Sequence, residues 1–299
     1  MFGAILTIFI IMAFGFITRH AKILKDGDYK VMNNFIYYAA LPALIFISLY
    51  DNGTSAFSDW TLITANAAAI LVMIALVLLV SALIKLPRKL IAVFLLAAFY
   101  GNILYMGYQV NVLEFGEVSA PIVVMVVTVY NLIIFSLGLA LLQAYSDGLN
   151  TPDIVKRIST NPLLLSSAIG LIYIYAGLPA LPASLAEAIR LVGHVTSPVA
   201  IFAMGVFMYG RNPFAQLKLN LAISATKMFF FPLLFVAIAR AFSLTGLGYE
   251  VSLFEAAMPL AVSNFVLADH YKLDTELVSS AIVLTTLLSL ISLPILSSL

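Results

Sequence analysis

The chain has 299 residues, of which 63% are hydrophobic and only 10% are charged. Soluble globular proteins carry about 25% charged residues, so the composition excludes an ordinary water-soluble fold and indicates one polytopic membrane domain. The net charge of +1 provides no basic field for nucleic acid. The absence of cysteine excludes disulfides, thiolate chemistry and iron–sulfur clusters.

Ten long apolar segments run along the chain. A membrane-spanning helix needs about 20 mostly apolar residues, and continuous apolar runs favour helices over the alternating pattern of barrel strands. We therefore predict an all-α polytopic membrane protein with ten transmembrane helices. The predicted segments are 2–18, 32–50, 60–84, 90–112, 118–145, 162–178, 185–209, 219–241, 250–268 and 276–298.

The basic residues between these segments predict the orientation of the chain. Short cytoplasmic loops collect Lys and Arg. Twelve Lys and Arg residues lie in the connections after the odd-numbered segments, whereas the other connections contain only Arg240. We therefore expect a multi-pass protein of the plasma (inner) membrane with both termini outside the cytoplasm. The twelve residues are Arg19, Lys22, Lys25, Lys30, Lys85, Arg88, Lys89, Lys156, Arg157, Arg211, Lys218 and Lys272.

The two halves of the chain resemble each other in their landmarks. An offset of about 156 residues places Pro42 on Pro198 and Gly15 near Gly170, and five helices per half would make the second copy inverted, as in many secondary transporters. The alternative is a chance alignment of two apolar halves. We predict a first five-helix repeat over 1–149 and an inverted second repeat over 160–299.

Segments 90–112 and 250–268 carry helix-breaking and polar residues at matching places in the two halves. Glycine and proline favour unwinding, and backbone groups freed at membrane depth must face protein, water or substrate. The alternative is an ordinary kink with glycines for close packing. Two matching breaks favour a midplane binding site. The residues concerned are Gly101, Asn102, Gly107, Gln109 and Asn111 in the first segment, and Glu255, Pro259, Ser263 and Asn264 in the second.

These motifs, in this order and spacing, resemble the auxin efflux carrier family, which lies in a wider superfamily that includes bile-acid sodium symporters. The resemblance covers essentially the whole chain. One departure is Gln109, where family members often have proline, so the unwinding of segment 90–112 is left to Gly101 and Gly107. The motifs are Asn33–Leu44 (NNFIYYAALPAL), Tyr100-Gly101-Asn102 with Gly107, Asn161-Pro162, Pro198 with Ala203-Met204-Gly205, and Glu255–Asn264 (EAAMPLAVSN).

The resemblance implies two sub-bundles in a homodimeric carrier of small organic anions such as carboxylates. The first, second, sixth and seventh segments would form a scaffold. The third to fifth and eighth to tenth would form a moving, elevator-like transport bundle, in which segments 90–112 and 250–268 cross. The expected substrate-binding residues are Asn102, Tyr105, Gln109, Pro259, Ser263, Asn264 and Lys227.

Two charged residues lie within the predicted spans near this site. Lys227 lies about 13 Å deep at 1.5 Å per residue, and an intramembrane charge by default suggests function. The alternatives are an ion pair with Glu255 or snorkelling to the surface. Glu255 is open to three roles, namely proton carrier, sodium ligand and charge-balancing partner of Lys227. Elsewhere, Ser184 and Glu187 have capping-box spacing, which predicts a helix start near Ser184 and an interfacial position for Arg190.

Three functional classes compete. A secondary carrier of organic anions, with export as the expected direction, fits the repeat and the broken helices. Proton- or sodium-coupled uptake is the alternative form of this class. An intramembrane enzyme is disfavoured, because we find no catalytic or metal-binding motif. A channel or a membrane ligand sensor is the third class. We expect no cofactor, no metal site and no nucleic-acid partner, with the lipid bilayer and a small organic anion as partners.

Overall fold

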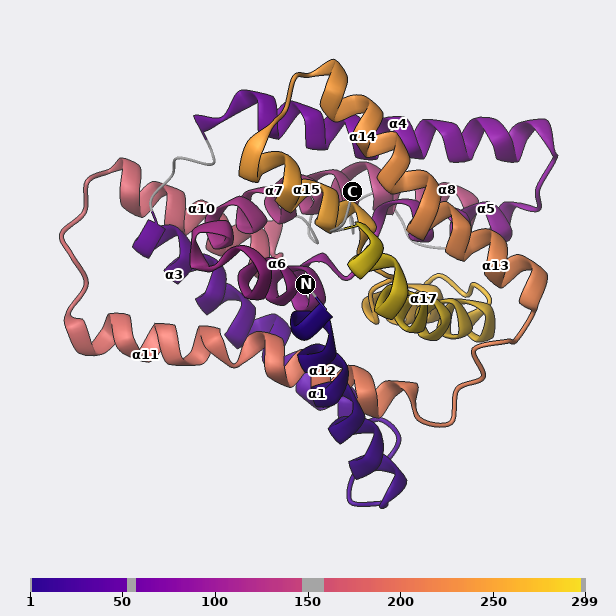
Figure 1. Cartoon of the computed structure of the whole chain (residues 1–299), viewed down its shortest axis with the longest axis horizontal. Coiled ribbons are helices and arrows are strands. Elements are labelled where there is room, and N and C mark those ends of the chain that lie inside the picture. Colours follow the sequence, from indigo (N-terminus) through magenta and orange to yellow (C-terminus); the bar gives the residue numbers. More distant parts are fainter. Residues whose placement is uncertain (1, 53–57, 147–158, 297–299) are drawn as a thin grey trace. The chain divides into compact units, whose positions relative to one another are not determined.

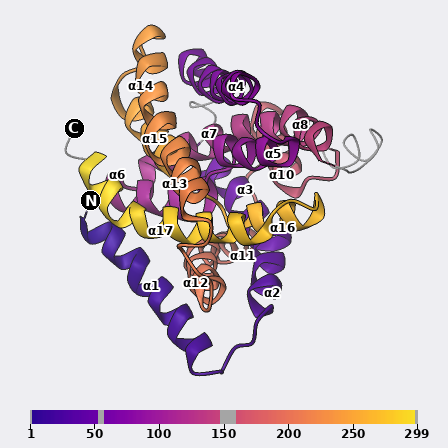
Figure 2. The same cartoon turned by 90° about the vertical axis from the view of Figure 1, so that its right-hand side faces the viewer.

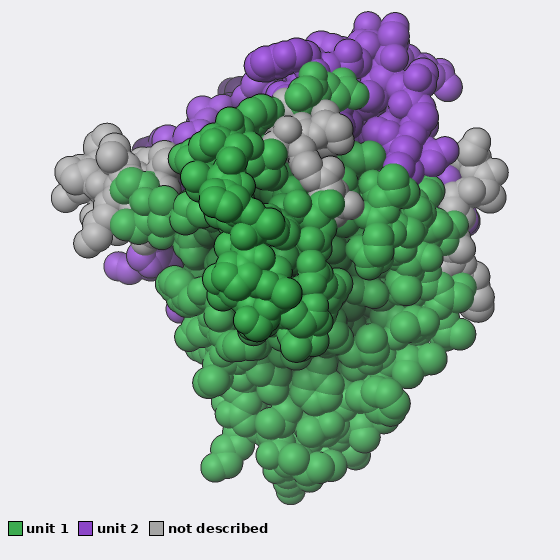
Figure 3. Space-filling model, turned by 90° about the vertical axis from the view of Figure 1, so that its left-hand side faces the viewer, with its two compact units in different colours: residues 1–59, 104–128, 159–209 green, residues 60–103, 129–158, 210–299 purple. Residues whose placement is uncertain are grey.

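The computed structural model describes residues 2–52, 58–146 and 159–296. In this part of the chain every regular element is a helix and no β-strand occurs, which agrees with the predicted all-α polytopic class. The chain divides into two compact units that interleave along the sequence (Figure 3). Lys156 and Arg157 of the charge pattern, and the predicted repeat boundary at residue 149, lie outside the described residues.

Unit 1 comprises Met1–Asp59, Leu104–Thr128 and Ser159–Tyr209. The resemblance groups the residues of Leu104–Thr128 with the transport helices. In the structure these residues belong to unit 1, which also contains the expected scaffold helices. Its described elements are α1 (Phe2–His20), α2 (Asp28–Phe35), the π-helical turn η1 (Ile36–Ala40), α3 (Leu41–Asn52), α6 (Tyr108–Phe115), the 3-10 turn η4 (Glu117–Ser119), the first part of α7 (Ala120–Ile133), α10 (Pro162–Tyr175), α11 (Ala183–His194) and α12 (Thr196–Met208).

Glycines allow the helices of unit 1 to touch backbone to backbone. α1 packs along α12 (Figure 1), and a Cβ atom on Gly205 would overlap the carbonyl oxygen of Met12. A Cβ on Gly15 would likewise overlap the carbonyl oxygen of Phe202. Without a hydrophobic driving force inside lipid, such small-residue contacts are a main source of helix association.

Replacing Gly205 with alanine is therefore expected to destabilise unit 1 by about 1–3 kcal/mol or more, because the added methyl group meets backbone that cannot rotate away. The midpoint of thermal unfolding in detergent measures the effect. Gly3→Ala in α1 is the control, since no atom lies within 4 Å of its Cβ position. Equal unfolding midpoints for Gly205→Ala and Gly3→Ala would contradict the close packing.

The start of α11 differs in detail from the capping-box prediction. The helix begins at Ala183, one residue before Ser184, and Pro182 at the N-cap position makes no side-chain cap. The carboxylate of Glu187 instead accepts a hydrogen bond from Arg190 at 2.7 Å. Arg190 also donates to both carboxylate oxygens of Asp51, at 2.8 and 3.1 Å. The arginine therefore ties α11 to α3 and takes the glutamate that the capping box would need.

Unit 2 comprises Trp60–Ile103, Val129–Ile158 and Gly210–Leu299. Within it α14 packs on α4 and α15, and α13 packs on α17 (Figure 2). Its described elements are α4 (Trp60–Leu83), α5 (Arg88–Phe99), the end of α7, the π-helical turn η5 (Ile134–Gly138), α8 (Leu139–Tyr145), α13 (Leu217–Ala225), the π-helical turn η6 (Thr226–Phe230), α14 (Phe231–Ala241), α15 (Gly246–Ala257), α16 (Ser263–His270) and α17 (Thr275–Leu296).

A proline accounts for the π-helical turn that carries Lys227. Pro232 lies in the first turn of α14, and proline cannot donate the hydrogen bond to the carbonyl four residues earlier. The helix widens just before it, over η6. Such π-helical turns often occur at functional positions, and this one bears the only lysine that is fully buried among the described residues.

Seven stretches of the described chain are long and apolar enough to cross a membrane. The other three predicted segments correspond to α10, which is a shorter apolar helix, and to the two segments whose helices are interrupted. The chain is therefore a multi-pass membrane protein by its helices. The seven stretches are Gly3–His20, Asp28–Asp51, Trp60–Leu83, Glu117–Tyr145, Ala183–Met208, Leu217–Ala241 and Thr275–Leu296.

Candidate functional site: two interrupted helices in unit 2

The first interruption follows α5. This helix ends at Phe99, and the residues Tyr100–Asn102 are not helical before the π-helical turn η3 (Ile103–Gly107) and α6 continue the segment. Gly101 lies at the centre of the interruption, where the absence of a Cβ atom lowers the cost of leaving helical geometry. Gln109, at the position where the resembled family often has proline, lies inside α6. The break therefore precedes Gln109 and depends on Gly101.

The second interruption separates α15 from α16. Met258–Val262 lack helical structure between Ala257 and Ser263, and the two helices are distinct in Figure 2. Pro259 lies within this stretch and has no N–H group to continue the helix. The helix is thus interrupted at Pro259, where the sequence places the break.

The two interruptions bind each other through their backbones. Gly101 and Leu260 form an antiparallel bridge. The Asn102 amide donates to the Pro259 carbonyl at 2.7 Å, and the Ala261 amide donates to the Tyr100 carbonyl at 3.3 Å. Backbone groups at membrane depth need such partners. We call Tyr100–Asn102 together with Met258–Val262 the crossing.

Side chains from α16 add to the crossing. Asn264 is fully buried and its Nδ2 donates to the Tyr100 carbonyl at 2.9 Å. The side chain of Ser263 hydrogen-bonds that of Tyr100. Asn102 is buried within the crossing itself. The structure therefore brings together the predicted residues Asn102, Pro259, Ser263 and Asn264.

Lys227 lies against the same structure. Its side chain is 0% exposed, so the snorkelling alternative is wrong. The Nζ atom donates to the carbonyl of Ala256 at 3.1 Å and lies 4.6 Å from the centroid of the Phe231 ring. Glu255, also 0% exposed, is close enough to interact electrostatically with the ammonium group. Lys227 therefore places its amino group at the C-terminal end of α15, where the negative helix dipole favours the protonated form.

The absence of a side chain at Gly101 makes room for this lysine. A Cβ atom at that position would lie 2.8 Å from Lys227 Nζ and 3.0 Å from its Cε. Gly101 thus serves two purposes, since it permits the interruption and admits the ammonium group. The contact joins η6, α15 and the first interruption in one buried polar cluster of unit 2.

Two predicted site residues belong to the other unit. Tyr105 lies in η3 and Gln109 in α6, both half-buried within unit 1. Asn111, two residues after Gln109 in α6, is buried and donates from Nδ2 to the carbonyl of Gly107 at 2.9 Å. Tyr105 and Gln109 therefore stay predictions as substrate-binding residues.

The polarity of the half-helices suits an anion. α5 and α15 end at the crossing, whereas α16 and the helical stretch that starts at Ile103 begin there. The first amides of a helix have no carbonyl partner within it and carry partial positive charge. A carboxylate is the kind of ligand that such N-termini and a buried ammonium group attract.

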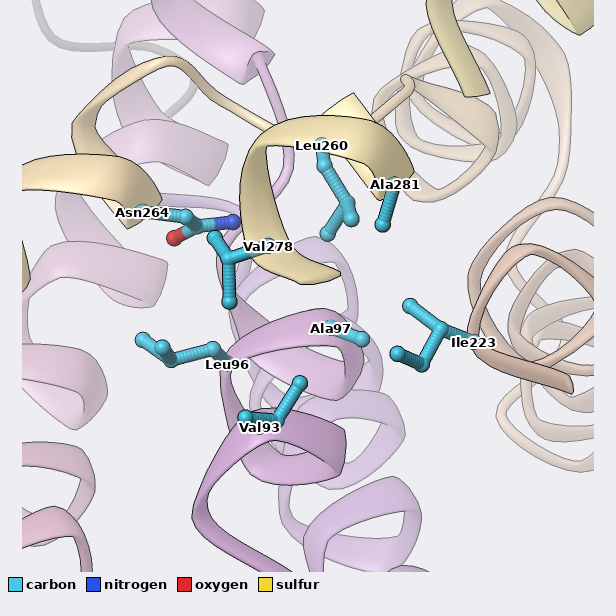
Figure 4. A pocket seen from close by; sticks show the side chains of 8 residues that line it. All are labelled: Val93, Leu96, Ala97, Ile223, Leu260, Asn264, Val278 and Ala281. Carbon is cyan, nitrogen blue, oxygen red and sulfur yellow. The ribbon is translucent and has the colours of Figure 1, made fainter. Parts of the chain in front are cut away.

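A small cavity lies beside the crossing (Figure 4). Its empty volume is about 180 Å³ when the open solvent at its mouth is included, and it has room for about one water molecule. Asn264 is its polar residue, and the rest of the lining is apolar. An organic anion does not fit, so we assign this cavity to packing around the crossing. The lining residues are Val93, Leu96, Ala97, Ile223, Leu260, Asn264, Val278 and Ala281.

Two residues that support the crossing are not among those predicted from the sequence. Tyr100 accepts two hydrogen bonds at its carbonyl, and Thr285 on α17 accepts one from the Leu260 amide at 3.2 Å. Tyr100 stands in the family motif, but it supports the crossing through its backbone carbonyl, which the residue type does not reveal. Thr285 has no local signal, because its role depends on a partner 25 residues away in the chain.

The site can be compared with known proteins. The sequence profile of the membrane transport protein family matches residues 1–297. The chain belongs to this family. The match spans both units and therefore every residue of the crossing, and it confirms the resemblance found in the sequence.

Transporters of other organisms are similar to this chain over all or part of its length. An uncharacterized transporter of Methanothermobacter thermautotrophicus is 30% identical over 298 residues, covering 97% of this chain and 95% of that protein. A Rhizobium meliloti protein named "Putative malonate transporter" is 26% identical over 298 residues, covering 96% and 92%. Auxin efflux carrier component 8 of Arabidopsis thaliana is 26% identical over 140 residues, covering 45% and 38%. The protein is thus a membrane transporter and not an enzyme.

Proposed function

We propose that the protein is a secondary active carrier of small organic anions that works by elevator-like alternating access. One observation carries the proposal: the interruptions of two helices are paired in unit 2, with the fully buried amino group of Lys227 beside them. Half-helix N-termini and such a charge favour a carboxylate. The expected binding residues are Asn102, Tyr105, Gln109, Pro259, Ser263, Asn264 and Lys227, with Glu255 for coupling or charge balance.

We further propose a ten-helix fold built from two inverted repeats. Reciprocal glycine contacts support this within unit 1. Gly15 of the first half meets Phe202 of α12, and its counterpart Gly170 in the second half meets Leu49 of α3. A pseudo-twofold axis relating the halves would exchange these two contacts.

The division into units supports separate scaffold and transport bodies. Every hydrogen bond of the crossing described above joins residues of unit 2. In the proposed mechanism the elements of unit 2 therefore move with the carrier body. The scaffold is formed by α1, α2, α3, α10, α11 and α12 of unit 1, which include the helices with backbone-to-backbone packing. The resemblance extends this proposal to a homodimer in the plasma membrane.

The names of the relatives support carboxylate substrates. One relative is named for malonate and another for auxin, and both compounds are carboxylates. Export of a monoanion requires no coupling ion, because an inside-negative potential favours its exit by about 2.3 kcal/mol per 100 mV. The alternatives are uptake coupled to a proton or sodium ion through Glu255, and ligand sensing without transport.

Counterflow in proteoliposomes tests the carrier proposal. We expect vesicles loaded with unlabelled malonate to accumulate labelled malonate transiently, with a saturable rate far below that of a channel. Varying pH and sodium in the same assay reveals coupling. A protein that malonate or indole acids stabilise against heat, but that gives no counterflow, would be a sensor. If these acids give neither stabilisation nor counterflow, the proposed substrate class is wrong.

The proposed orientation is testable because the chain has no native cysteine. Asp26 and Ala180 are exposed and lie in connections of unit 1 that are predicted on opposite sides of the membrane. In intact cells, a membrane-impermeant thiol reagent should label Ala180→Cys and should label Asp26→Cys only after lysis. Labelling in the reverse order would overturn the orientation.

A further inference from the structure

Two neighbouring threonines on α17 differ in their contacts with the crossing. Thr285 and Thr286 are both 0% exposed, and each hydroxyl donates at 2.7 Å to the carbonyl four residues before it, Ala281 for Thr285 and Ile282 for Thr286. Thr285 in addition accepts a hydrogen bond from the Leu260 amide at 3.2 Å. Because its own hydrogen is engaged with its helix, the Thr285 oxygen is oriented as an acceptor.

This contact replaces half of a missing helical hydrogen bond. In an uninterrupted helix the Leu260 amide would donate to the carbonyl of Ala256. That carbonyl instead accepts from Lys227 at 3.1 Å, and the amide is satisfied by Thr285. Lys227 and Thr285 thus serve as the donor and the acceptor for the two groups that the break separates.

The position of Leu260 makes this replacement important. Leu260 is the residue that bridges to Gly101, and the amide and carbonyl on either side of it, those of Ala261 and Pro259, pair with Tyr100 and Asn102. A buried amide without an acceptor destabilises the fold by the full free energy of desolvating that amide. Without the Thr285 hydroxyl, the stretch Met258–Val262 would therefore shift to find another partner.

We propose that Thr285 is a positioning residue for the substrate site, which it holds by fixing the Leu260 amide and hence the register of the crossing. The proposal rests on the function proposed above. In the proposed role Thr285 does not touch the substrate. It acts through the Leu260 amide, so α17 becomes part of the rigid support of the crossing.

A matched set of variants tests the proposal. Thr285→Val removes the hydroxyl and keeps the side-chain shape, Thr285→Ser keeps the hydroxyl, and Thr286→Val removes an equally buried hydroxyl that bonds to its own helix. At equal amounts of folded protein, we expect Thr285→Val to raise the half-saturating malonate concentration in counterflow by tenfold or more. Thr286→Val should stay within twofold of the native protein, and Thr285→Ser should recover most of the loss. A purely structural role would instead lower only the maximal flux.

Amide hydrogen exchange provides a readout that is independent of transport. In the purified protein, the peptide that contains Met258–Val262 should exchange at least tenfold faster in Thr285→Val than in Thr286→Val. Equal exchange in the two valine variants, or equal half-saturation, would overturn the role of Thr285. If the native protein transports no carboxylate, the proposed function is wrong, and so is the link of Thr285 to transport. Hydrogen exchange would still decide whether Thr285 holds the crossing in place.

Discussion

Replacing Lys227 with methionine is expected to weaken the binding of small organic anions by well over tenfold. Methionine keeps most of the side-chain volume and removes the amino group that is buried at the end of α15. The Ala256 carbonyl then loses its donor, at a cost of about 1–3 kcal/mol, and a substrate carboxylate loses a nearby cation. Since 1.4 kcal/mol corresponds to tenfold in affinity, the loss of a hydrogen bond between a charged group and the substrate, of about 1.5–3 kcal/mol, accounts for this decrease. Isothermal titration with malonate measures it.

Two further variants separate the roles of Lys227. Lys227→Arg should recover only part of the affinity, because the space beside Gly101 fits a compact ammonium group and a guanidinium group is wider. If Lys227 only balances Glu255, the double variant Lys227→Met/Glu255→Gln should regain the stability that Lys227→Met loses, since removing a buried pair costs less than breaking it. Lys218→Met, at an exposed position of α13, is the control. Unchanged affinity and stability in Lys227→Met would remove the lysine from the site.

The extent of the helices was predictable because it depends on local composition. The segment predicted at 60–84 is α4, Trp60–Leu83, and the segment predicted at 276–298 is described as α17, Thr275–Leu296. The position of the second interruption was predictable for the same reason, since a proline such as Pro259 cannot donate a helical hydrogen bond. These features follow from the length of the apolar segments and from single residues with an unusual backbone.

The partners within the crossing could not be predicted, because they depend on contacts between distant segments. Depth along the membrane normal suggests a gap of about 10 Å between Lys227 and Glu255 when both helices are treated as regular. The structure instead places a π-helical turn at Lys227 and ends α15 two residues after Glu255, so that the ammonium group reaches the carbonyl of Ala256. The capping box at Ser184 failed for a similar reason, because Arg190 engages Glu187.

Replacing Asn264 is the second change for which we expect a large effect. Its Nδ2 atom donates to the Tyr100 carbonyl at 2.9 Å, so the side chain ties the start of α16 to the first interruption. Asn264→Ala removes this tie and leaves the carbonyl with one hydrogen bond, from the Ala261 amide. The loss of a buried hydrogen bond of about 1–3 kcal/mol predicts a fall in malonate counterflow of roughly tenfold to a hundredfold.

Asn264→Asp should be more harmful than Asn264→Ala, although it is the smaller change in shape. It sets a carboxylate oxygen against the Tyr100 carbonyl, and two acceptors repel each other. It also adds a negative charge near the expected position of an anionic substrate. Asn102→Ala should reduce counterflow as well, since Asn102 lies in the crossing itself.

Asn220→Ala provides the matched control for Asn264. Asn220 is also fully buried in unit 2, and its Nδ2 donates at 2.7 Å to the Pro213 carbonyl and at 2.6 Å to the Ser280 hydroxyl, at the start of α13. The two alanine variants should lose similar thermal stability, because each loses buried hydrogen bonds of the same kind. Only Asn264→Ala should lose counterflow at equal amounts of folded protein. If Asn264→Ala and Asn220→Ala transport malonate equally well, the tie between α16 and Tyr100 serves stability alone, and the crossing is not the substrate site that we propose.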